Sequence, residues 1–232
     1  MNKSVYPLGD SAVALAFGPV ISEEVRELIV RICAFLDEYS FDGLVEYVPA
    51  YVSITIFYDP LVTDYPTVAV MMEEMLAELE ESEGSAVQPV LIEIPVLYGG
   101  GEGPDLELVA AAAGISPEEV IALHTANEYV VHMIGFAPGF PYLGGMDERI
   151  AMPRKETPRA IVPAGSVGIA GLQTGVYPID TPGGWQIIGT TPLNLFDADR
   201  EVPALLKAGN RLRFVAITEL EFDLIKEGND GY

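Results

Sequence analysis

The polar side chains best suited to chemistry are scattered through the apolar, glycine-rich second half of the 232-residue chain. His124 has an unperturbed pKa near neutrality and suits a general base, although a histidine at a helix end can bind a backbone carbonyl instead. Arg159 offers a planar fork for a carboxylate or phosphate, or an ion pair with one of the many acids. Gln173 supplies a neutral donor and acceptor. We interpret these three residues as catalytic candidates.

Four more residues of the same motifs are candidates for substrate binding. Gln186 and Ser166 offer hydrogen bonds, while Trp185 and Phe140 offer flat apolar walls, with core packing as the alternative for Trp185. A serine nucleophile is not indicated, because Ser166 lies in a strand-like run without the Gly-x-Ser-x-Gly elbow. His132 stands in a strand-like apolar run, and we interpret it as structural.

Composition excludes several classes of partner. Two histidines, one cysteine and no clustered carboxylate motif predict no bound metal. The formal charge of −23 repels phosphate backbones and anionic lipid, so neither nucleic acid nor a membrane surface is expected as a partner. Cys33 alone cannot form an intrachain disulfide, and no apolar stretch approaches the roughly 20 residues that span a bilayer. These features predict a soluble cytoplasmic protein, and the acidity also fits a salty habitat.

Three glycine-proline loops surround the candidates, at 135–145, 163–171 and 181–186. Glycine permits close backbone approach or positive φ, and proline fixes a loop, so these loops suit either a binding site or tight barrel corners. The sequence contains neither the phosphate-binding Gly-x-x-x-x-Gly-Lys-Ser/Thr nor a Gly-x-Gly-x-x-Gly after a strand. A P-loop nucleotide-binding domain is therefore not expected.

The elements of the first half predict a ferredoxin-like βαββαβ domain over residues 1–88. Strands are expected at 11–17, 44–48, 51–58 and 90–97. Two helices between them carry apolar residues at 3-4 spacing, each on one face. The first stripe contains Val25, Leu28, Ile29, Ile32, Cys33 and Leu36, and the second contains Val68, Met71, Met72, Met75, Leu76 and Leu79. One-sided helices of this kind cover one face of a sheet.

The second half predicts a β-barrel domain over residues 89–232. A helix is expected from Asp105 to Ala113 with Gly114 after it, and another opens at Ser116-Pro117-Glu118-Glu119, a capping-box pattern. Short β-type runs follow at 129–135, 160–163, 166–170, 185–190 and 211–217. Glycine and proline between such short runs favour a barrel over a βαβ sheet.

Four motifs in order resemble one known family. They are Gly135–Gly145, Pro158–Val167, Gln173–Pro178 and Pro182–Trp185, within a likeness that runs from about Asp10 to Ile217. They resemble the allophanate hydrolase subunit 1 family, to which the B subunit of 5-oxoprolinase and a sporulation-kinase inhibitor belong. The resemblance implies a cyclophilin-like barrel for the C-terminal domain. Thr190 departs from the pattern, because relatives carry arginine there, so any anion contact of that arginine is in doubt.

The resemblance implies one component of an ATP-dependent 5-oxoprolinase, which opens the lactam of 5-oxoproline to L-glutamate. Its implied partners are the A and C subunits of 5-oxoprolinase, the latter similar to allophanate hydrolase subunit 2, with ATP used by the complex. Two alternatives stay open: a regulator that binds and inhibits a sensor histidine kinase, and a urea- or allophanate-type amidohydrolase or carboxyltransferase subunit.

Overall fold

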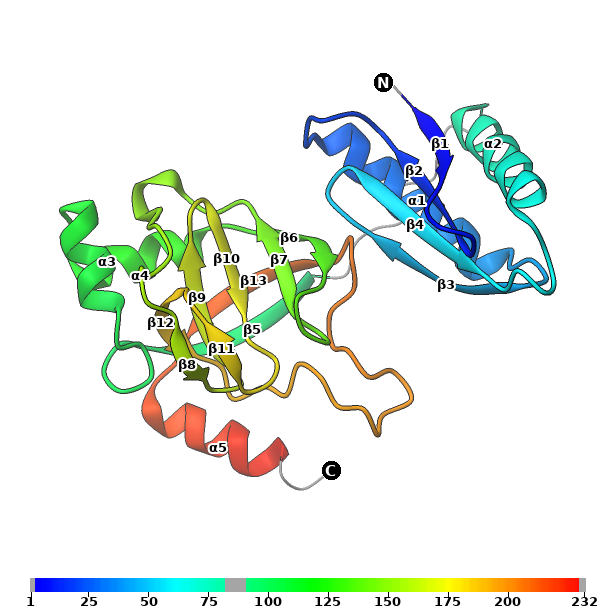
Figure 1. Ribbon diagram of the computed structural model, residues 1–232. Helices are drawn as coiled ribbons and strands as arrows, with labels where there is room; N and C mark the ends of the chain where they lie inside the picture. The colour runs from blue at the N-terminus through cyan, green and yellow to red at the C-terminus, as the bar shows by residue number, and fades with distance from the viewer. Residues whose placement is uncertain (1–2, 82–90, 230–232) are drawn as a thin grey trace. The chain divides into compact units, whose positions relative to one another are not determined.

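The computed structural model describes residues 3–81 and 91–229. The chain forms two compact units, Met1–Gln88 and Pro89–Tyr232 (Figure 1). The predicted boundary between residues 88 and 89 lies outside the described residues. Each unit has a hydrophobic core of its own, as separate domains do.

The first unit is a four-stranded antiparallel sheet with two helices packed into one core with it. The strand order is β1-β2-β4-β3. Helix α1 begins where the sequence predicts, because the Ser22 hydroxyl accepts a hydrogen bond of 3.2 Å from the Val25 amide. The elements in chain order are β1 (Ser4–Pro7), β2 (Ala12–Ala16), α1 (Glu23–Glu38), β3 (Leu44–Pro49), β4 (Ser53–Tyr58) and α2 (Tyr65–Glu81).

The predicted apolar faces of both helices are buried, with two exceptions. Cys33 is only half-buried, and Met71 remains 38% exposed. Burial raises the pKa of the Cys33 thiol to about 12, so this side chain is an inert thiol rather than a nucleophile. The remaining stripe residues pack against β2 and β4.

The predicted order βαββαβ is wrong at its fourth strand. The segment β5 (Leu91–Tyr98) belongs to the second unit, where it pairs in parallel with residues 211–216. The fourth strand of the N-terminal sheet is instead β1, which pairs antiparallel with β2. The split βαβ part is as expected, because β4 lies between β2 and β3. An alternating apolar segment does not reveal which sheet it joins, since the pairing is non-local.

The second unit contains a closed barrel, which confirms the predicted barrel class. Its strands follow the order β10-β7-β6-β13-β5-β12-β9 around the barrel, and a separate pair is formed by β8 (Arg159–Val162) and β11 (Thr181–Gly183). The barrel strands are β5, β6 (Tyr129–Ile134), β7 (Pro141–Gly144), β9 (Ser166–Ala170), β10 (Gln173–Val176), β12 (Gln186–Thr190) and β13 (Arg211–Ala216). The short strands β7, β10 and β11 were not expected from the sequence.

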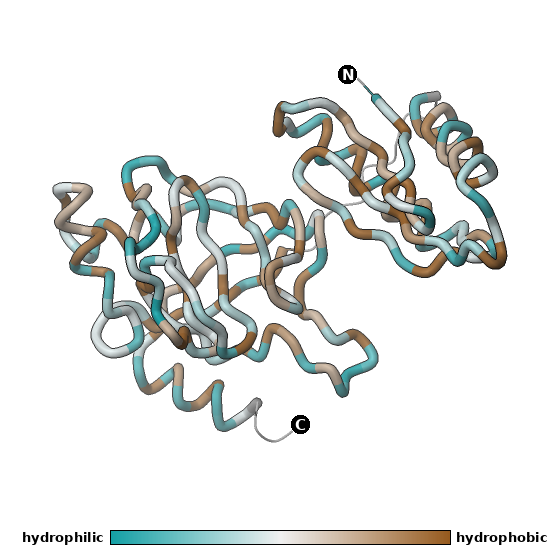
Figure 2. Tube along the Cα trace, viewed as in Figure 1, coloured by the Kyte–Doolittle hydropathy of each residue, from teal (hydrophilic) through white to brown (hydrophobic). Residues whose placement is uncertain are grey.

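Helical segments accompany the barrel (Figure 1). Helix α3 (Leu106–Ala113) ends at Gly114 with φ 70°, and α4 (Pro117–Ala126) begins with the capping box of Ser116 and Glu119, both as predicted. A 3-10 turn covers Glu148–Ile150, and α5 (Glu219–Asn229), not expected from the sequence, lies against β5. Figure 2 shows hydrophilic and hydrophobic residues alternating along α5. Among its hydrophobic residues, Phe222 is buried, whereas Leu220 and Leu224 are exposed.

Candidate functional site

A pocket of about 320 Å³ lies in the second unit beside the β8–β11 pair, within the size range of ligand sites. Five aromatic side chains form its walls: Phe136, Phe140, Tyr142, Tyr177 and Trp185. Two of the predicted glycine-proline loops, 135–145 and 181–186, supply most of them. The remaining lining residues are Arg154, Pro158, Pro182, Gly183 and Gly184.

The aromatic walls meet at nearly right angles. Phe140 lies edge-on to Trp185 at 5.4 Å between ring centroids and 88° between ring planes, and to Tyr177 at 5.3 Å and 79°. Such edge-to-face pairs are favourable because the positive ring edge meets the negative ring face. Phe140, Tyr177 and Trp185 are each at least 95% buried, so these walls are rigid.

Glycine is required where the backbone passes these rings. A Cβ on Gly175 would lie 3.1 Å from atoms of both Phe140 and Trp185, and 2.9 Å from the Pro141 carbonyl oxygen. A Cβ on Gly183 would overlap the Tyr177 hydroxyl. The glycine content of these motifs therefore serves close packing of aromatic rings around the pocket.

Phe136 stands at the pocket with a strained backbone. Its φ is 68°, and among the described residues it is the one non-glycine residue with positive φ. The Ala137 amide donates to the Gly135 carbonyl at 2.8 Å, which closes a three-residue γ-turn around Phe136, a rare and strained conformation. The turn leaves the Phe136 ring 62% exposed while its edge meets Phe140 and Tyr177.

The charge at the pocket comes from Arg154. Its guanidinium lies 6.0 Å from the centre of the Trp185 ring, a cation–π distance. No aspartate or glutamate lines the pocket, and in the part of the chain that the structure describes Arg154 has no acidic partner. In a chain of formal charge −23, this pocket is therefore locally attractive to an anion.

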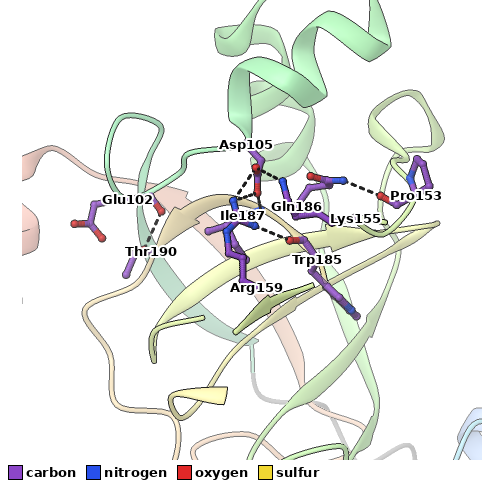
Figure 3. Close-up of polar contacts among 9 residues, drawn as sticks. All are labelled: Glu102, Asp105, Pro153, Lys155, Arg159, Trp185, Gln186, Ile187 and Thr190. Atoms are coloured by element: carbon purple, nitrogen blue, oxygen red, sulfur yellow. Dashed lines mark hydrogen bonds and ion pairs between the residues drawn. The ribbon is translucent and has the colours of Figure 1, made fainter. Parts of the chain in front are cut away.

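The carboxylate of Asp105 organises the loop that carries Arg154 (Figure 3). Asp105 is 4% exposed and accepts hydrogen bonds from the Lys155 Nζ at 2.9 Å, the Arg159 guanidinium at 2.8 Å and the Ile187 amide at 2.7 Å. Burial alone would raise the pKa of this carboxyl, but those three donors outweigh it, and the pKa lies below its usual value. Asp105 thus joins the start of α3, the 153–159 loop and β12.

Arg159 and Gln186, two of the predicted polar site residues, belong to this arrangement. Besides its pair with Asp105, Arg159 contacts the Trp185 carbonyl at 3.4 Å, so it makes the ion pair that was its alternative interpretation. Gln186 donates from Nε2 to the Pro153 carbonyl at 2.9 Å, while its buried Oε1 has no partner among the described residues. Both side chains stabilise the residues around the pocket through these contacts, and neither lines the pocket itself.

His124 lies in the core of the barrel unit and is fully buried. Thr174 donates its hydroxyl hydrogen to the Gly168 carbonyl at 3.0 Å, so its oxygen must accept from His124 Nε2, which is 2.9 Å away. Nδ1 then accepts from the Tyr98 hydroxyl at 2.7 Å. Burial lowers the pKa of His124 to about 3, so it is neutral at pH 7 and far from the near-neutral pKa expected for a base.

The other predicted residues are divided between the pocket and the barrel strands. Phe140 and Trp185 line the pocket, Ser166 is buried at the start of β9, and Gln173 is half-buried at the start of β10. His132 is half-buried on β6, and a Cβ on Gly144 would overlap its ring. Thr190 donates to the Glu102 carbonyl at 3.0 Å (Figure 3), a loop contact rather than an anion contact.

Sequence reasoning missed the pocket residues Phe136, Tyr142, Arg154 and Tyr177, and the buried Asp105. The available signals were that Phe136, Tyr142 and Tyr177 lie inside the glycine-proline motifs and that Arg154 directly follows Pro153. Among residues 3–81 and 91–229 no group of three metal-ligating side chains occurs. No helix in those residues is long and apolar enough to cross a membrane.

The chain is similar to proteins of known families. Residues 3–206 match the family model described as carboxyltransferase domain, subdomain C and D. The chain is 51% identical over 230 residues, 95% of each chain, to the 5-oxoprolinase B subunit of Bacillus subtilis.

Solved structures share the fold. TTHA0988 superposes with a TM-score of 0.78 at 36% identity, covering 90% of this chain and 40% of that one. The urea amidolyase of Kluyveromyces lactis superposes with a TM-score of 0.76 at 19% identity, covering 98% of this chain and 16% of that one, which shows the fold alone. The chain therefore belongs to the family of carboxyltransferase-domain subdomains C and D and, within it, groups with the B subunits of 5-oxoprolinases.

Proposed function

We propose that this chain is one subunit of a cytoplasmic, ATP-dependent 5-oxoprolinase that opens the lactam of 5-oxoproline to L-glutamate together with the A and C subunits of that enzyme. The observation that carries the proposal is the 51% identity, across 95% of both chains, to a protein named as the B subunit of 5-oxoprolinase. The match spans both units, so the likeness is not limited to a shared barrel.

The proposed reaction adds water across the lactam bond. The hydroxyl goes to the carbonyl carbon and the proton goes to the ring nitrogen, which leaves as the amine of glutamate. The amide is resonance-stabilised, and the ring recloses readily because amine and carboxyl stay on one molecule. Coupling to ATP hydrolysis would supply the activation that water alone lacks.

The pocket in this chain does not suit a triphosphate. Among the described residues Arg154 is the only cation that lines it, and the nearby Lys155 and Arg159 are paired with Asp105. Triphosphates are usually bound by several backbone amides, a lysine and a metal ion, and the sequence lacks the corresponding loop. We therefore assign ATP binding to the partner subunits and the holding of the organic substrate to this chain.

A requirement for partner protein has support from relative lengths. The region similar to this chain makes up 40% of TTHA0988, so in that protein it is joined to a longer polypeptide. In this system the additional parts would be separate subunits.

Reconstitution tests the proposal. The three purified subunits are incubated with 5-oxoproline and ATP, glutamate and ADP are measured, and each subunit is then omitted in turn. We expect glutamate only from the complete mixture, and no 5-oxoproline-dependent ATP hydrolysis by this chain alone. The proposal fails if the complete mixture forms no glutamate, and turnover of urea in place of 5-oxoproline or inhibition of a histidine kinase would identify the alternative function.

A further inference from the structure

We propose that the aromatic pocket binds a small, flat organic monoanion whose ring lies between the aromatic walls and whose carboxylate pairs with Arg154. The identification of this anion as 5-oxoproline rests on the proposed function; the class of ligand rests on the pocket itself.

The shape of the pocket selects a small ring. Phe140 and Tyr177 stand nearly perpendicular to Trp185, so the cavity presents flat faces rather than a round hole. Close packing at Gly175 and Gly183 fixes these rings and keeps the pocket open without a ligand. Preformed, rigid walls of this kind bind a rigid ring with little ordering cost.

The charge of the pocket selects an anion with a single negative group. Within the described part of the chain, Arg154 is the one charged residue of the lining, and no carboxylate neutralises it. A guanidinium at the edge of an apolar site recognises a carboxylate through paired, charge-assisted hydrogen bonds. With one cation available, a monocarboxylate is matched and a polyphosphate is not.

Arg154 is held in place by its neighbours in the chain. Gln186 binds the Pro153 carbonyl on one side, and on the other the Lys155 amide donates to the Gly184 carbonyl at 2.7 Å while its Nζ binds Asp105. These contacts fix the backbone on both sides of Arg154. The ion pairs of the buried Asp105 thus position the cation without touching the ligand.

The strained turn at Phe136 is the second independent feature of a binding site. A non-glycine residue at φ 68° has a disfavoured backbone conformation, and the Phe136 ring stays 62% exposed although its edge meets Phe140 and Tyr177. A ligand beneath the ring would bury it, which gives the strained turn a function.

Fluorescence of Trp185, the single tryptophan of the chain, reports occupancy of the pocket directly. The full-length chain is titrated with 5-oxoproline, with 2-pyrrolidinone, which has the lactam ring without the carboxylate, and with acetate, which has the carboxylate without the ring. We expect a saturable response to 5-oxoproline with Kd between about 10 μM and 1 mM, the range of many substrate affinities. Binding of 2-pyrrolidinone and acetate should each be about tenfold weaker or more.

A pair of arginine variants provides the control. Arg154→Gln should weaken 5-oxoproline about tenfold and leave 2-pyrrolidinone unchanged, because only the carboxylate contact is lost. Arg149→Gln removes the same charge from an exposed residue outside the pocket that is paired with Asp147, and should change neither.

Three results would overturn the inference. The first is no saturable response up to about 20 mM, well above a millimolar Kd. The others are equal binding of 5-oxoproline and 2-pyrrolidinone, and equal effects of the two arginine variants.

The 5-oxoprolinase C subunit provides a further comparison. A change in Trp185 fluorescence when that subunit is added, without any response to 5-oxoproline, would show that the pocket receives a protein side chain instead. If the reconstituted complex forms glutamate but the pocket does not bind, the proposed function stands and this inference fails. If the pocket binds 5-oxoproline but the complex forms no glutamate, this inference stands and the proposed function fails.

Discussion

Protonation of His124 should make the barrel unit unstable in acid, and the structure gives the size of the effect. The ring is fully buried as the neutral Nε2–H tautomer, and its pKa is lowered to about 3, against about 6.5 in the unfolded chain. Between these values the unfolded state binds a proton that the folded state does not. Stability therefore falls as pH decreases from 6.5 toward 3.

The slope follows from linkage. A single such group contributes about 1.4 kcal/mol per pH unit, so the loss is about 3 kcal/mol by pH 4 and about 4 kcal/mol by pH 3, where the folded state is itself half protonated. The lowered pKa of Asp105 contributes stability that is fully present above the unfolded value of about 3.8 and is lost as the pH falls from there toward the folded-state pKa. The window from about pH 6.5 to 4 thus belongs mainly to His124.

Replacement by glutamine separates this titration from the packing of the ring. His124→Gln keeps a donor for Thr174 and an acceptor for Tyr98, but it loses the stacking on Phe214, whose ring centroid is 4.4 Å away. We expect the variant to be about 1–3 kcal/mol less stable at pH 7 and to lose about 1.4 kcal/mol less per pH unit below pH 6.5, so the two curves cross between about pH 4 and 6.

Urea unfolding followed by Trp185 fluorescence at several pH values measures both curves, since the single tryptophan belongs to the barrel unit. His132→Gln is the matched control, because it removes the other histidine and measures how much of the slope follows from loss of a histidine elsewhere in the barrel unit. Parallel curves for His124→Gln and the wild type would refute the reasoning: His124 would then be protonated in the fold, or the acid sensitivity would come from other groups.

Three further predictions concern the loop, the turn and the first unit. Asp105→Asn should lower the free energy of unfolding by about 1–2 kcal/mol, because the two cations that lose their charged partner are partly exposed. Asp105→Ala should lower it by about 3 kcal/mol, because alanine also leaves the Ile187 amide without an acceptor. Urea unfolding measures both variants, and equal losses would contradict this account. Phe136→Gly should raise the free energy of unfolding by about 0.5–1 kcal/mol by relieving the positive φ, yet weaken 5-oxoproline binding severalfold in the fluorescence titration; weaker folding with unchanged binding would exclude a ligand role. A fragment of residues 1–85 contains the whole four-stranded sheet and should fold alone, as judged by circular dichroism and cooperative unfolding, whereas an unfolded fragment would show that it depends on the barrel unit.

Features set by neighbours in the chain could be predicted, and those set by distant partners could not. The capping box of Ser116 and Glu119 and the glycine after Ala113 are local signals, and both helix ends lie where predicted. Thr218 and Glu221 form a similar reciprocal cap at the start of α5, a signal that was present in the sequence and overlooked. The strand at 91–98 was recognised, but its sheet was misassigned because its partners lie more than 90 residues away in the sequence.

The same distinction explains the outcome for the site. A polar side chain inside an apolar motif needs either partners within the protein or a ligand, and sequence alone does not say which. For His124 the partners are Tyr98 and Thr174, and for Arg159 the partner is Asp105, 54 residues earlier. Both ring nitrogens of His124 are already hydrogen-bonded, and Arg159 makes its ion pair with Asp105. Arg154 drew no attention in the sequence, yet it is the arginine at the pocket that the acidic chain leaves without a carboxylate among the described residues. In this protein, a polar side chain that still lacks a partner therefore indicates the binding site better than a polar side chain's position in a glycine-rich motif does.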